Sequence, residues 1–524
     1  MSSTQFPRRH GADFDETFDV IVLGFGFAGG AAAIAASDRG CSVLLAEKMS
    51  DPGGISITAG GGIRTARDAD KAFAYLKAAC DGRTDDAVLR VFARDLTTLD
   101  DHIRELAAVN GAVCESREHH GNYPFPGYDT FGAIEVSAVP GFDPRVGYPH
   151  VRGRNRGPLL FKVVEDNVRK RSIDVRCGFP AVRLITDPAG AVVGATFRAG
   201  DALRRIRARR GVILACGGFE ADRAMQEQYW QIKPVYSAAS RGNTGDGIKM
   251  AQDVGADLWH MWLFHGSYGM LHPDPANATC FRMKRLPDWR PAGRIAGKDV
   301  PAKLDRAVPM SWIVVNRRGR RFMNEAPPYM QDTGHRPLDL FDAQTQSFPN
   351  IPAYVIIDEE GRKMYPLGQA VFNDREAEPY DWSADNLKEV QLGILKKAST
   401  MEELAAIIGA PSETMRATLD RWNAQCQAGK DEDFDRPTEM MTPIRTPPYY
   451  VAEIWPVVSN TQGGPRHDAR QRVLDTFGNP ISRLYTAGEL GSIWGSLYLG
   501  GGNLSECFIT GRIAACEAAE MPID

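Results

Sequence analysis

The sequence has no closely spaced cysteine pair. Its nine cysteines are scattered singly over 524 residues without a CxxC, the spacing typical of zinc, iron–sulfur and haem attachment sites. We interpret them as reduced thiols, which are typical of a cytoplasmic protein. Adjacent histidines seldom share one metal ion, so the pair His119-His120 does not predict a metal site.

A strong net charge and long apolar runs are also missing. The net charge is −4 and the sequence pI about 6.2, so nothing indicates a nucleic acid partner. No run approaches the roughly 20 apolar residues that cross a bilayer, and the first residues, MSSTQFPRRHGADFDE, are too polar for a secretory signal. We therefore expect a cytoplasmic protein without a transmembrane segment. An amphipathic membrane contact and the oligomeric state stay open.

A dinucleotide-binding pattern begins at residue 18. The apolar run FDVIVLG predicts a buried parallel strand, and a helical stretch follows the glycines Gly24, Gly26 and Gly29 of a GxGxxG motif. A second apolar strand ends at Glu47. Gly24 allows the tight turn, Gly26 admits a pyrophosphate, and Gly29 lets helix and strand pack closely. Glu47 is placed to accept hydrogen bonds from a ribose.

Further glycine-tipped segments favour FAD over a nicotinamide nucleotide. After Glu47, the clusters Gly53-Gly54 and Gly60-Gly61-Gly62 flank Ser56 and Thr58, which suits an extended flavin. The strands in GVILACGGFE (211–220) and RLYTAGELG (483–491) also end in glycines, and Glu489 is placed to bind a ribitol hydroxyl. The segments at the two ends of the chain therefore indicate one FAD-binding domain that the C-terminus completes.

The predicted FAD-binding residues lie in or beside these glycine-rich segments. They are Gly24, Gly26, Phe27, Ala28, Gly29, Glu47, Lys48, Gly54, Ile55, Ser56, Ala59, Gly60, Gly61, Ala215, Gly217, Gly218, Asp246, Gly488, Glu489, Asn503 and Leu504.

Seven motifs in order carry a family resemblance. They are GFGFAGGAAA, GGISITAGGG, ACGGFE, NTGDGIKMAQDVGA, IVVNRRGRRFMNE, NTQGGPRHD and the C-terminal series LYTAGE, GGGN and TGRIA. Together they resemble the flavoprotein family of fumarate reductases, succinate dehydrogenase flavoprotein subunits and 3-ketosteroid dehydrogenases. The resemblance covers almost the whole chain.

The resemblance implies an α/β fold. A Rossmann-like FAD-binding domain, a parallel sheet with helices, would be built from both chain ends, 15–270 and 443–524, with an α+β capping domain inserted over 271–442. The histidyl-linked members of the family carry a histidine near the second glycine cluster. None is present here, so we expect FAD to be bound without a covalent link.

Two tyrosines stand where fumarate reductases have arginines. Tyr498, in WGSLYLGGGN, takes the place of the arginine that clamps a substrate carboxylate, and Tyr329 that of the proton-donating arginine. Asn460 replaces a substrate histidine, whereas His265 matches the remaining one. A phenol supplies no positive charge, and a desolvated dicarboxylate without a cationic partner would cost several kcal/mol per ion. The sequence therefore argues against fumarate or succinate as substrate.

The same positions carry tyrosines in the 3-ketosteroid Δ1-dehydrogenases. By that resemblance Tyr498 and the Gly502 N–H would polarise the ketone, and Tyr329 would remove the neighbouring proton as general base. Tyr123 would assist, with Tyr128 as the other choice. The loop after Tyr498 lacks a proline that those enzymes have, so ring position and reaction direction stay open. We expect its three glycines to let the loop carry substrate on one side and flavin on the other, with the N-terminus of the following helix directed at the flavin.

These observations predict an FAD-dependent oxidoreductase that acts on a CH–CH bond next to a ketone. The expected substrate is a small apolar ketone or enone, with a 3-ketosteroid dehydrogenase as the leading reading. A flavin-dependent reductase of another α,β-unsaturated carbonyl compound is the alternative, and a non-catalytic flavin-binding subunit is a third. No haem or FMN domain is evident, so the electron acceptor or donor would be external. We expect the basic cluster Arg317, Arg318, Arg320 and Arg321 to be solvated.

Overall fold

The computed structural model describes residues 14–153, 156–274, 280–290, 292–295, 298–304, 306–377 and 380–523. Most of the polar N-terminal stretch, on which the expected absence of a secretory signal depends, lies outside these ranges. Among the described residues, every helix is too short or too polar to cross a membrane.

The first large sheet is built from both ends of the chain, as predicted. Its main order is β26-β27-β10-β1-β2-β7, and β1 pairs in parallel with both β10 and β2. The strands are β1 (Glu16–Leu23), β2 (Val43–Ala46), β7 (Asp174–Arg176), β8 (Ala181–Thr186), β9 (Val192–Ala199), β10 (Ala202–Leu214), β26 (Arg472–Leu474) and β27 (Pro480–Thr486). The C-terminal strand β27 lies beside β10 and so completes the N-terminal sheet.

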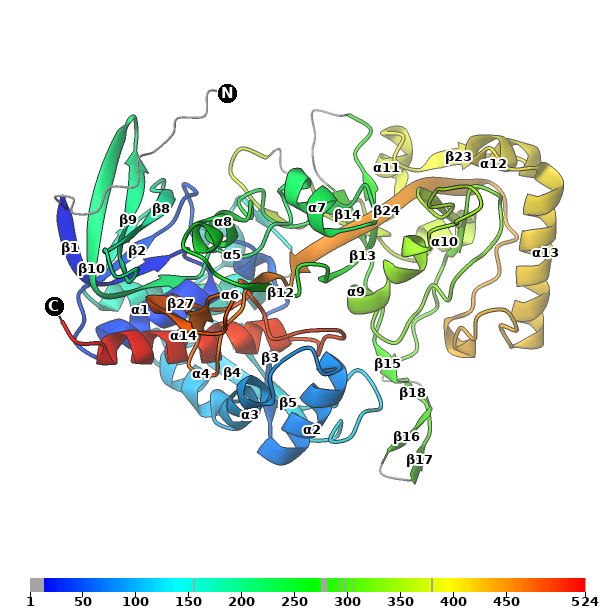
Figure 1. Cartoon of the computed structure of the whole chain (residues 1–524). Helices are drawn as coiled ribbons and strands as arrows, with labels where there is room; N and C mark the ends of the chain where they lie inside the picture. The colour runs from blue at the N-terminus through cyan, green and yellow to red at the C-terminus, as the bar shows by residue number, and fades with distance from the viewer. Residues whose placement is uncertain are drawn as a thin grey trace.

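Both faces of this sheet are buried, which explains its continuous apolar strands. Val20 and Val22 of β1 face one apolar cluster and Ile21 and Leu23 face another, because successive strand residues point to opposite sides. The first face is covered by α1 (Phe27–Ser37), α6 (Arg156–Lys170) and α14 (Gly502–Glu520), of which α14, red in Figure 1, packs along α1. The other face packs against β8, β9 and α8 (Asp246–Asp253).

A small antiparallel sheet and three helices extend the first layer. The sheet has the order β3-β5-β4, from β3 (Ile63–Ala66), β4 (Val113–Glu118) and β5 (Phe131–Ala138). The helices are α2 (Ala69–Cys80), α3 (Asp86–Asp95) and α4 (Leu99–Ala107).

A second large sheet forms the capping part. Its main order is β19-β20-β24-β13-β14-β21, with β11 and β23 also paired to β24. The strands are β11 (Tyr236–Ser237), β13 (Phe264–Leu271), β14 (Cys280–Met283), β19 (Ile313–Val315), β20 (Ala353–Ile357), β21 (Gly368–Gln369), β23 (Lys396–Ala398) and β24 (Tyr449–Thr461). The segments MEELAAIIG and SETMRATLDRWNAQC, whose sequences predict short helices, form α12 (Met401–Ile408) and α13 (Ser412–Ala428).

The predicted boundaries at 270/271 and 442/443 divide this sheet. Most of β13 and all of β24 lie outside 271–442, yet they pair with each other and with cap strands on either side. Both strands are largely buried, and β24, orange in Figure 1, runs from beside the first sheet far into the cap. The sheet pairing therefore assigns 264–271 and 449–461 to the cap sheet. The division of the chain into domains otherwise stays a prediction.

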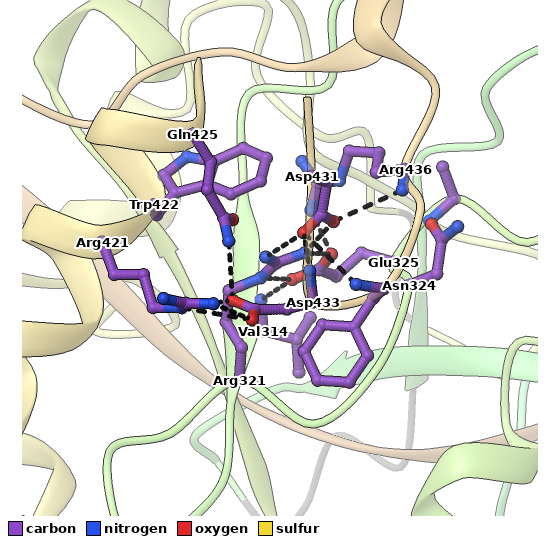
Figure 2. Close-up of polar contacts among 12 residues, drawn as sticks. Val314, Arg321, Asn324, Glu325, Arg421, Trp422, Gln425, Asp431, Asp433 and Arg436 are labelled. Atoms are coloured by element: carbon purple, nitrogen blue, oxygen red, sulfur yellow. Dashed lines mark hydrogen bonds and ion pairs between the residues drawn. The ribbon is translucent and has the colours of Figure 1, made fainter. Parts of the chain in front are cut away.

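A buried ionic network fixes the segment that leads to Tyr329. Figure 2 shows Arg321 between Glu325 and Asp431, at 2.8 and 2.9 Å, and Arg436 also pairs with Glu325. The side chain of Arg321 is 5% exposed, so the prediction of a solvated cluster is wrong for this residue. Arg317, Arg318 and Arg320 are exposed, as predicted.

The remaining elements are short. They are α5 (Pro144–Gly147), α7 (Arg223–Tyr229), α9 (Met330–Thr333), α10 (Glu359–Met364), α11 (Leu387–Gln391), the 3-10 turns η1 (Ser56–Thr58), η2 (Arg336–Asp339) and η3 (Thr438–Met440), and the two-stranded pairs β6 (Val151–Arg152) with β22 (Phe372–Asn373), β12 (Leu258–Trp259) with β25 (Gly464–Pro465), β15 (Trp289–Arg290) with β18 (Lys303–Leu304), and β16 (Gly293–Ile295) with β17 (Lys298–Val300).

Candidate active site

A cavity of about 380 Å³ lies between the first sheet, the small sheet and the cap. All the predicted FAD-binding residues line it except Phe27, Gly29, Gly218 and Gly488, which lie outside its lining. Tyr329 and Tyr498 line the same cavity. The structure therefore brings the glycine-rich segments and the two tyrosines to one site.

The GxGxxG turn has no room for side chains. Gly24 has φ +100°, and a Cβ on Gly29 would lie 1.8 Å from the Gly24 carbonyl oxygen. Helix α1 begins directly after Gly26, so its N-terminal N–H groups lie beside the cavity. This is the local geometry that a dinucleotide pyrophosphate requires.

Glu47 lies at the end of β2, where the sequence predicted a ribose-binding carboxylate. Its side chain accepts backbone N–H bonds from Phe25 at 2.9 Å and Met49 at 2.8 Å. Burial raises the pKa of Glu47, and these bonds and the Lys48 charge oppose that rise. Lys48 is itself paired with Asp246 at 2.6 Å. The carboxylate is thus held from the protein side while it faces the cavity.

The second glycine-rich segment lies against the first. The Ser56 hydroxyl accepts the Phe27 N–H at 3.2 Å, which joins the turn η1 to the start of α1. Farther along the cavity, Glu489 accepts the Thr461 N–H at 2.9 Å and lies near Glu220. Burial, together with the charge of Glu220, raises the pKa of Glu489 well above its usual value. Glu489 thus faces the cavity with its carboxyl held at the Thr461 N–H, where a ligand hydroxyl can hydrogen-bond to it.

Three buried amide atoms at the tyrosine end have no partner within the described chain. They are Asn460 Nδ2, Gln462 Nε2 and Asn503 Oδ1. Asn460 and Asn503 line the cavity, and Gln462 contacts Asn503 through a 3.4 Å hydrogen bond. Buried polar atoms without partners are rare, and here they suit the polar edge of an isoalloxazine.

Tyr329 and Tyr498 form a buried pair. Their ring centroids are 5.9 Å apart and the rings are inclined by 22°. His265 packs edge-on against Tyr498, with centroids 4.1 Å apart. Tyr329 precedes α9, Tyr498 precedes α14 and His265 lies on β13, so three distant segments build this end of the cavity.

The Tyr498 hydroxyl accepts two backbone N–H groups, from Gly501 and Asn503, each at 3.1 Å. Burial, together with the nearby Tyr329, raises the pKa of Tyr498 well above its usual value. Within the described part of the chain, the hydroxyl proton has no acceptor. Tyr498 is therefore a neutral donor that two peptide N–H groups polarise toward the cavity.

Gly502 is placed differently from the prediction. Its N–H donates to the Leu499 carbonyl at 2.7 Å, within the turn that starts α14, and Gly502 does not line the cavity. In this structure the Gly502 N–H is therefore engaged and cannot bind a ketone oxygen. The neighbouring N–H groups of Gly501 and Asn503 instead donate to the Tyr498 hydroxyl.

Tyr123 lies behind the site rather than in it. Its hydroxyl donates to Asp332 at 2.6 Å, and the same carboxylate oxygen accepts the Tyr498 N–H at 2.9 Å. His265 Nδ1 lies 3.8 Å from the other oxygen of Asp332. Burial opposes ionisation of Asp332, but His265 and the other partners lower its pKa below the usual value. The other choice, Tyr128, has its ring 4.8 Å from the Arg290 guanidinium carbon.

Sequence reasoning missed the basic residues of the cavity. Arg64, Arg282 and Arg285 all line it, and the guanidinium carbon of Arg285 lies 5.2 Å from the Tyr329 ring centroid. Each of the three interacts electrostatically with Tyr329. No local motif marks them, because they lie on β3 and on separate segments of the cap and become neighbours of Tyr329 only through tertiary packing. Asp332 was missed for the same reason.

The chain belongs to the FAD binding domain family, whose model matches residues 19–504. This confirms the predicted family and FAD as cofactor. The glycine cradle, the two glutamates and the partnerless amide atoms fit that cofactor.

Similar proteins act on ketones. A 3-oxosteroid 1-dehydrogenase of Mycobacterium tuberculosis (strain ATCC 25618 / H37Rv) is 32% identical over 339 residues, or 60% of this chain and 54% of the relative. The match thus spans about half the length of that relative. A 4-oxocyclohexanecarboxylate 2-dehydrogenase of Sinomonas cyclohexanicum is 27% identical over 96% of this chain and 94% of its own. These relatives agree with the predicted class of FAD-dependent oxidoreductases.

Solved structures share the fold. A 3-ketosteroid Δ1-dehydrogenase from Sterolibacterium denitrificans, in complex with 1,4-androstadiene-3,17-dione, has a TM-score of 0.78 at 24% identity and covers 96% of this chain and 99% of its own. A flavocytochrome c3 fumarate reductase has a TM-score of 0.66 at 22% identity over 97% and 79%. These likenesses confirm the α/β flavoprotein fold.

Proposed function

We propose that the protein dehydrogenates a ring ketone at the CH–CH bond next to the carbonyl. The observation that carries this proposal is the contrast between the two buried tyrosines. Tyr498 is held neutral by burial, whereas Tyr329 has the Arg285 guanidinium against its ring. Arg64 and Arg285 act electrostatically on both phenols, so the roles are assigned by geometry. The Tyr498 oxygen already accepts two N–H groups and presents its proton, and Tyr329 is assigned as the base.

Each tyrosine then has one role. The Tyr498 hydroxyl donates a hydrogen bond to the ketone oxygen and stabilises the negative charge that develops there. This makes the hydrogen on the neighbouring carbon acidic, and Tyr329 accepts that proton. FAD bound in the glycine-rich part of the cavity would supply the acceptor for the hydride from the next carbon, and loss of the proton and the hydride would leave a C=C bond in the product.

Asp332 and Tyr123 are positioning residues in this scheme. Asp332 binds the Tyr498 backbone N–H and lies beside His265, and Tyr123 holds that carboxylate from behind. The assistance that we expected from Tyr123 is therefore indirect, and no contact between its hydroxyl and the substrate is needed.

The relatives support two ketone classes. The 3-oxosteroid 1-dehydrogenases favour a 3-ketosteroid, while the dehydrogenase from Sinomonas cyclohexanicum, matched along almost its whole length, favours a cyclohexanone with a carboxylate. A digoxin reductase from Eggerthella lenta, 26% identical over 97% of this chain, supports the alternative of enone reduction. In either direction an external electron acceptor or donor completes the cycle.

Anaerobic flavin bleaching tests the proposal. A ring ketone should reduce the flavin absorbance of the purified holoenzyme, whereas Tyr329→Phe should slow this step by roughly 100-fold or more with FAD still bound. Tyr236→Phe is the matched control, since Tyr236 lies on β11 and does not line the cavity. Unchanged bleaching in Tyr329→Phe would refute the assignment of the base.

A further inference from the structure

Arg282 is a cationic group of the cavity without an acidic partner. Its Nη2 donates to the Ala238 carbonyl at 2.8 Å, while its Nε is buried and has no hydrogen-bond partner. Within the described residues, no carboxylate lies within ion-pair distance of its guanidinium. Desolvation lowers the pKa of Arg282 to about 10, and the nearby Arg285 adds to that shift, whereas Tyr329 and the more distant Glu220 oppose it. Such a guanidinium is incompletely compensated until an anion joins it.

The other arginines of the cavity differ from Arg282. Arg285 is paired with Asp288 at 2.6 Å and also donates to Gln331 at 2.8 Å. Arg64 donates to the Gly500 and His120 carbonyls at 2.8 and 3.3 Å. Its guanidinium N–H groups therefore already bind the backbone, including the glycine loop after Tyr498. Arg117 is exposed and therefore hydrated. Within the described residues, Arg282 thus combines a half-buried position in the cavity lining, a buried Nε without a hydrogen-bond partner and the absence of a carboxylate at ion-pair distance. Glu220 acts on it only at longer range.

The position of Arg282 indicates the substrate end of the cavity. It lies on β14 directly opposite Gly269 of β13, the strand that also carries His265. It interacts electrostatically with Tyr329, whereas the adenosine end is defined by Glu47 and Lys48 on the first sheet. An anion bound by Arg282 would therefore share the cavity with a ketone at the two tyrosines.

We propose that Arg282 binds a carboxylate of the substrate, so that the substrate class is cyclic ketones that carry a carboxylate. This inference rests on the proposed function of Tyr329 and Tyr498 and makes it more specific. A guanidinium offers a carboxylate two parallel N–H donors, which fixes the orientation of the ring as well as its affinity. In this arrangement the tyrosines bind the ketone group of the substrate, and Arg282 binds its carboxylate at a second position in the cavity.

The experiment compares an acid with its neutral ester. The holoenzyme is mixed with 4-oxocyclohexanecarboxylate or its methyl ester, and kcat/KM is measured for wild type, Arg282→Gln, Arg282→Lys and Lys284→Gln. We expect Arg282→Gln to lower the acid-to-ester ratio of kcat/KM by about 100-fold, as for the loss of one charge partner, whereas any effect through Tyr329 changes acid and ester alike. Arg282→Lys should recover part of the loss. Lys284→Gln is the control, because Lys284 is adjacent but faces Tyr365 outside the cavity.

A binding measurement separates this inference from the proposed reaction. Cyclohexanecarboxylate has no ketone, so its titration into the holoenzyme, followed by the shift in flavin absorbance, reports binding of the acid alone. We expect wild type and Tyr329→Phe to bind it alike and Arg282→Gln to bind about 100-fold more weakly.

Two outcomes would overturn the role of Arg282. Equal binding of cyclohexanecarboxylate by wild type and Arg282→Gln would exclude a carboxylate contact. Loss of FAD from Arg282→Gln, with an unchanged acid-to-ester ratio in FAD-saturated protein, would assign Arg282 to the cofactor diphosphate. If acid and ester both leave the flavin oxidised while cyclohexanecarboxylate still binds through Arg282, the proposed function fails and the anion site stands.

Discussion

At the scale of single residues, the surroundings of a side chain decide its chemistry. Tyr329 and Tyr498 are the same residue type in one buried pair, yet one has a guanidinium against its ring and the other has two peptide N–H groups at its oxygen. Glu47 and Glu489 also have different surroundings. Glu47 accepts two backbone N–H groups, whereas Glu489 lies beside a second acid, Glu220.

The hydroxyl of Tyr498 provides a residue-scale prediction. Tyr498→Phe removes the donor to the ketone oxygen, and we expect kcat to fall by about 100- to 1000-fold, as when one oxyanion donor is removed. The FAD content should not change, since the hydroxyl lies between the glycine loop and the substrate. Stopped-flow flavin reduction measures the rate, and the 450 nm to 280 nm absorbance ratio measures the FAD content. A rate within 3-fold of wild type would contradict the assigned role.

At the scale of elements, the cap depends on charges that are fully removed from water. Glu325 is 0% exposed and pairs with both Arg321 and Arg436 on segments more than a hundred residues apart (Figure 2). Burial alone would raise its pKa, but Arg436 and Arg321 lower it to about 2. The network holds the turn after β19 and so the chain that enters α9 beside Tyr329.

The pKa of Glu325 predicts how the stability of the cap depends on pH. The folded pKa is about 2 and the ordinary value is 4.5, so the stabilisation is fully present above pH 4.5 and is lost as the pH falls toward 2. At about 1.4 kcal/mol per unit, the contribution at neutral pH is on the order of 3 kcal/mol.

Variants of Glu325 test this linkage. Glu325→Gln should lower the free energy of unfolding by about 3–5 kcal/mol at pH 7, because two guanidiniums lose their partner, and by much less near pH 3. The exposed Glu432→Gln is the control. Urea unfolding of both variants between pH 3 and 7 measures the difference. A penalty for Glu325→Gln that is equal at both pH values would show that the ion pairs do not stabilise the cap.

At the scale of the whole molecule, the FAD site joins segments from one end of the chain to the other. The cavity is lined by Gly24 near the N-terminus, by Arg282 and Tyr329 of the cap, and by Asn503 at the start of the last helix. A cofactor bound in this cavity would therefore contact both the first sheet and the cap, which the strands β13 and β24 also connect.

Removal of FAD should destabilise the whole molecule. A ligand that binds only the folded state stabilises it by about 2.7 kcal/mol at a concentration 100 times Kd. We expect the apoprotein to unfold at a lower Tm and FAD addition to raise the Tm in a concentration-dependent way. Thermal unfolding followed by tryptophan fluorescence measures this shift. A Tm that is independent of FAD would contradict a site shared between the first sheet and the cap.

The sequence predicted the elements that local patterns specify. The strand, turn and helix around Gly24, Gly26 and Gly29, the carboxylate at the end of β2 and the helices α12 and α13 lie where they were expected. The two tyrosines were found through the family resemblance, and the structure places both in the cavity. The sequence did not predict that the Gly502 N–H donates to the Leu499 carbonyl. A single hydrogen bond within a glycine-rich turn decides this, and no sequence pattern specifies it.

The sequence by itself determined that this chain binds FAD, because a dinucleotide site is made of backbone that approaches a ligand closely, and glycine spacing between short apolar strands records that requirement locally. Only the tertiary structure decided which charges surround the two cavity tyrosines. Arg282, Arg285 and Asp332 come from the cap and carry no motif, and they meet Tyr498 only because β13 and β24 connect the cap sheet to the cavity. Electrostatic interactions act through space, so their partners are set by packing and not by separation along the chain.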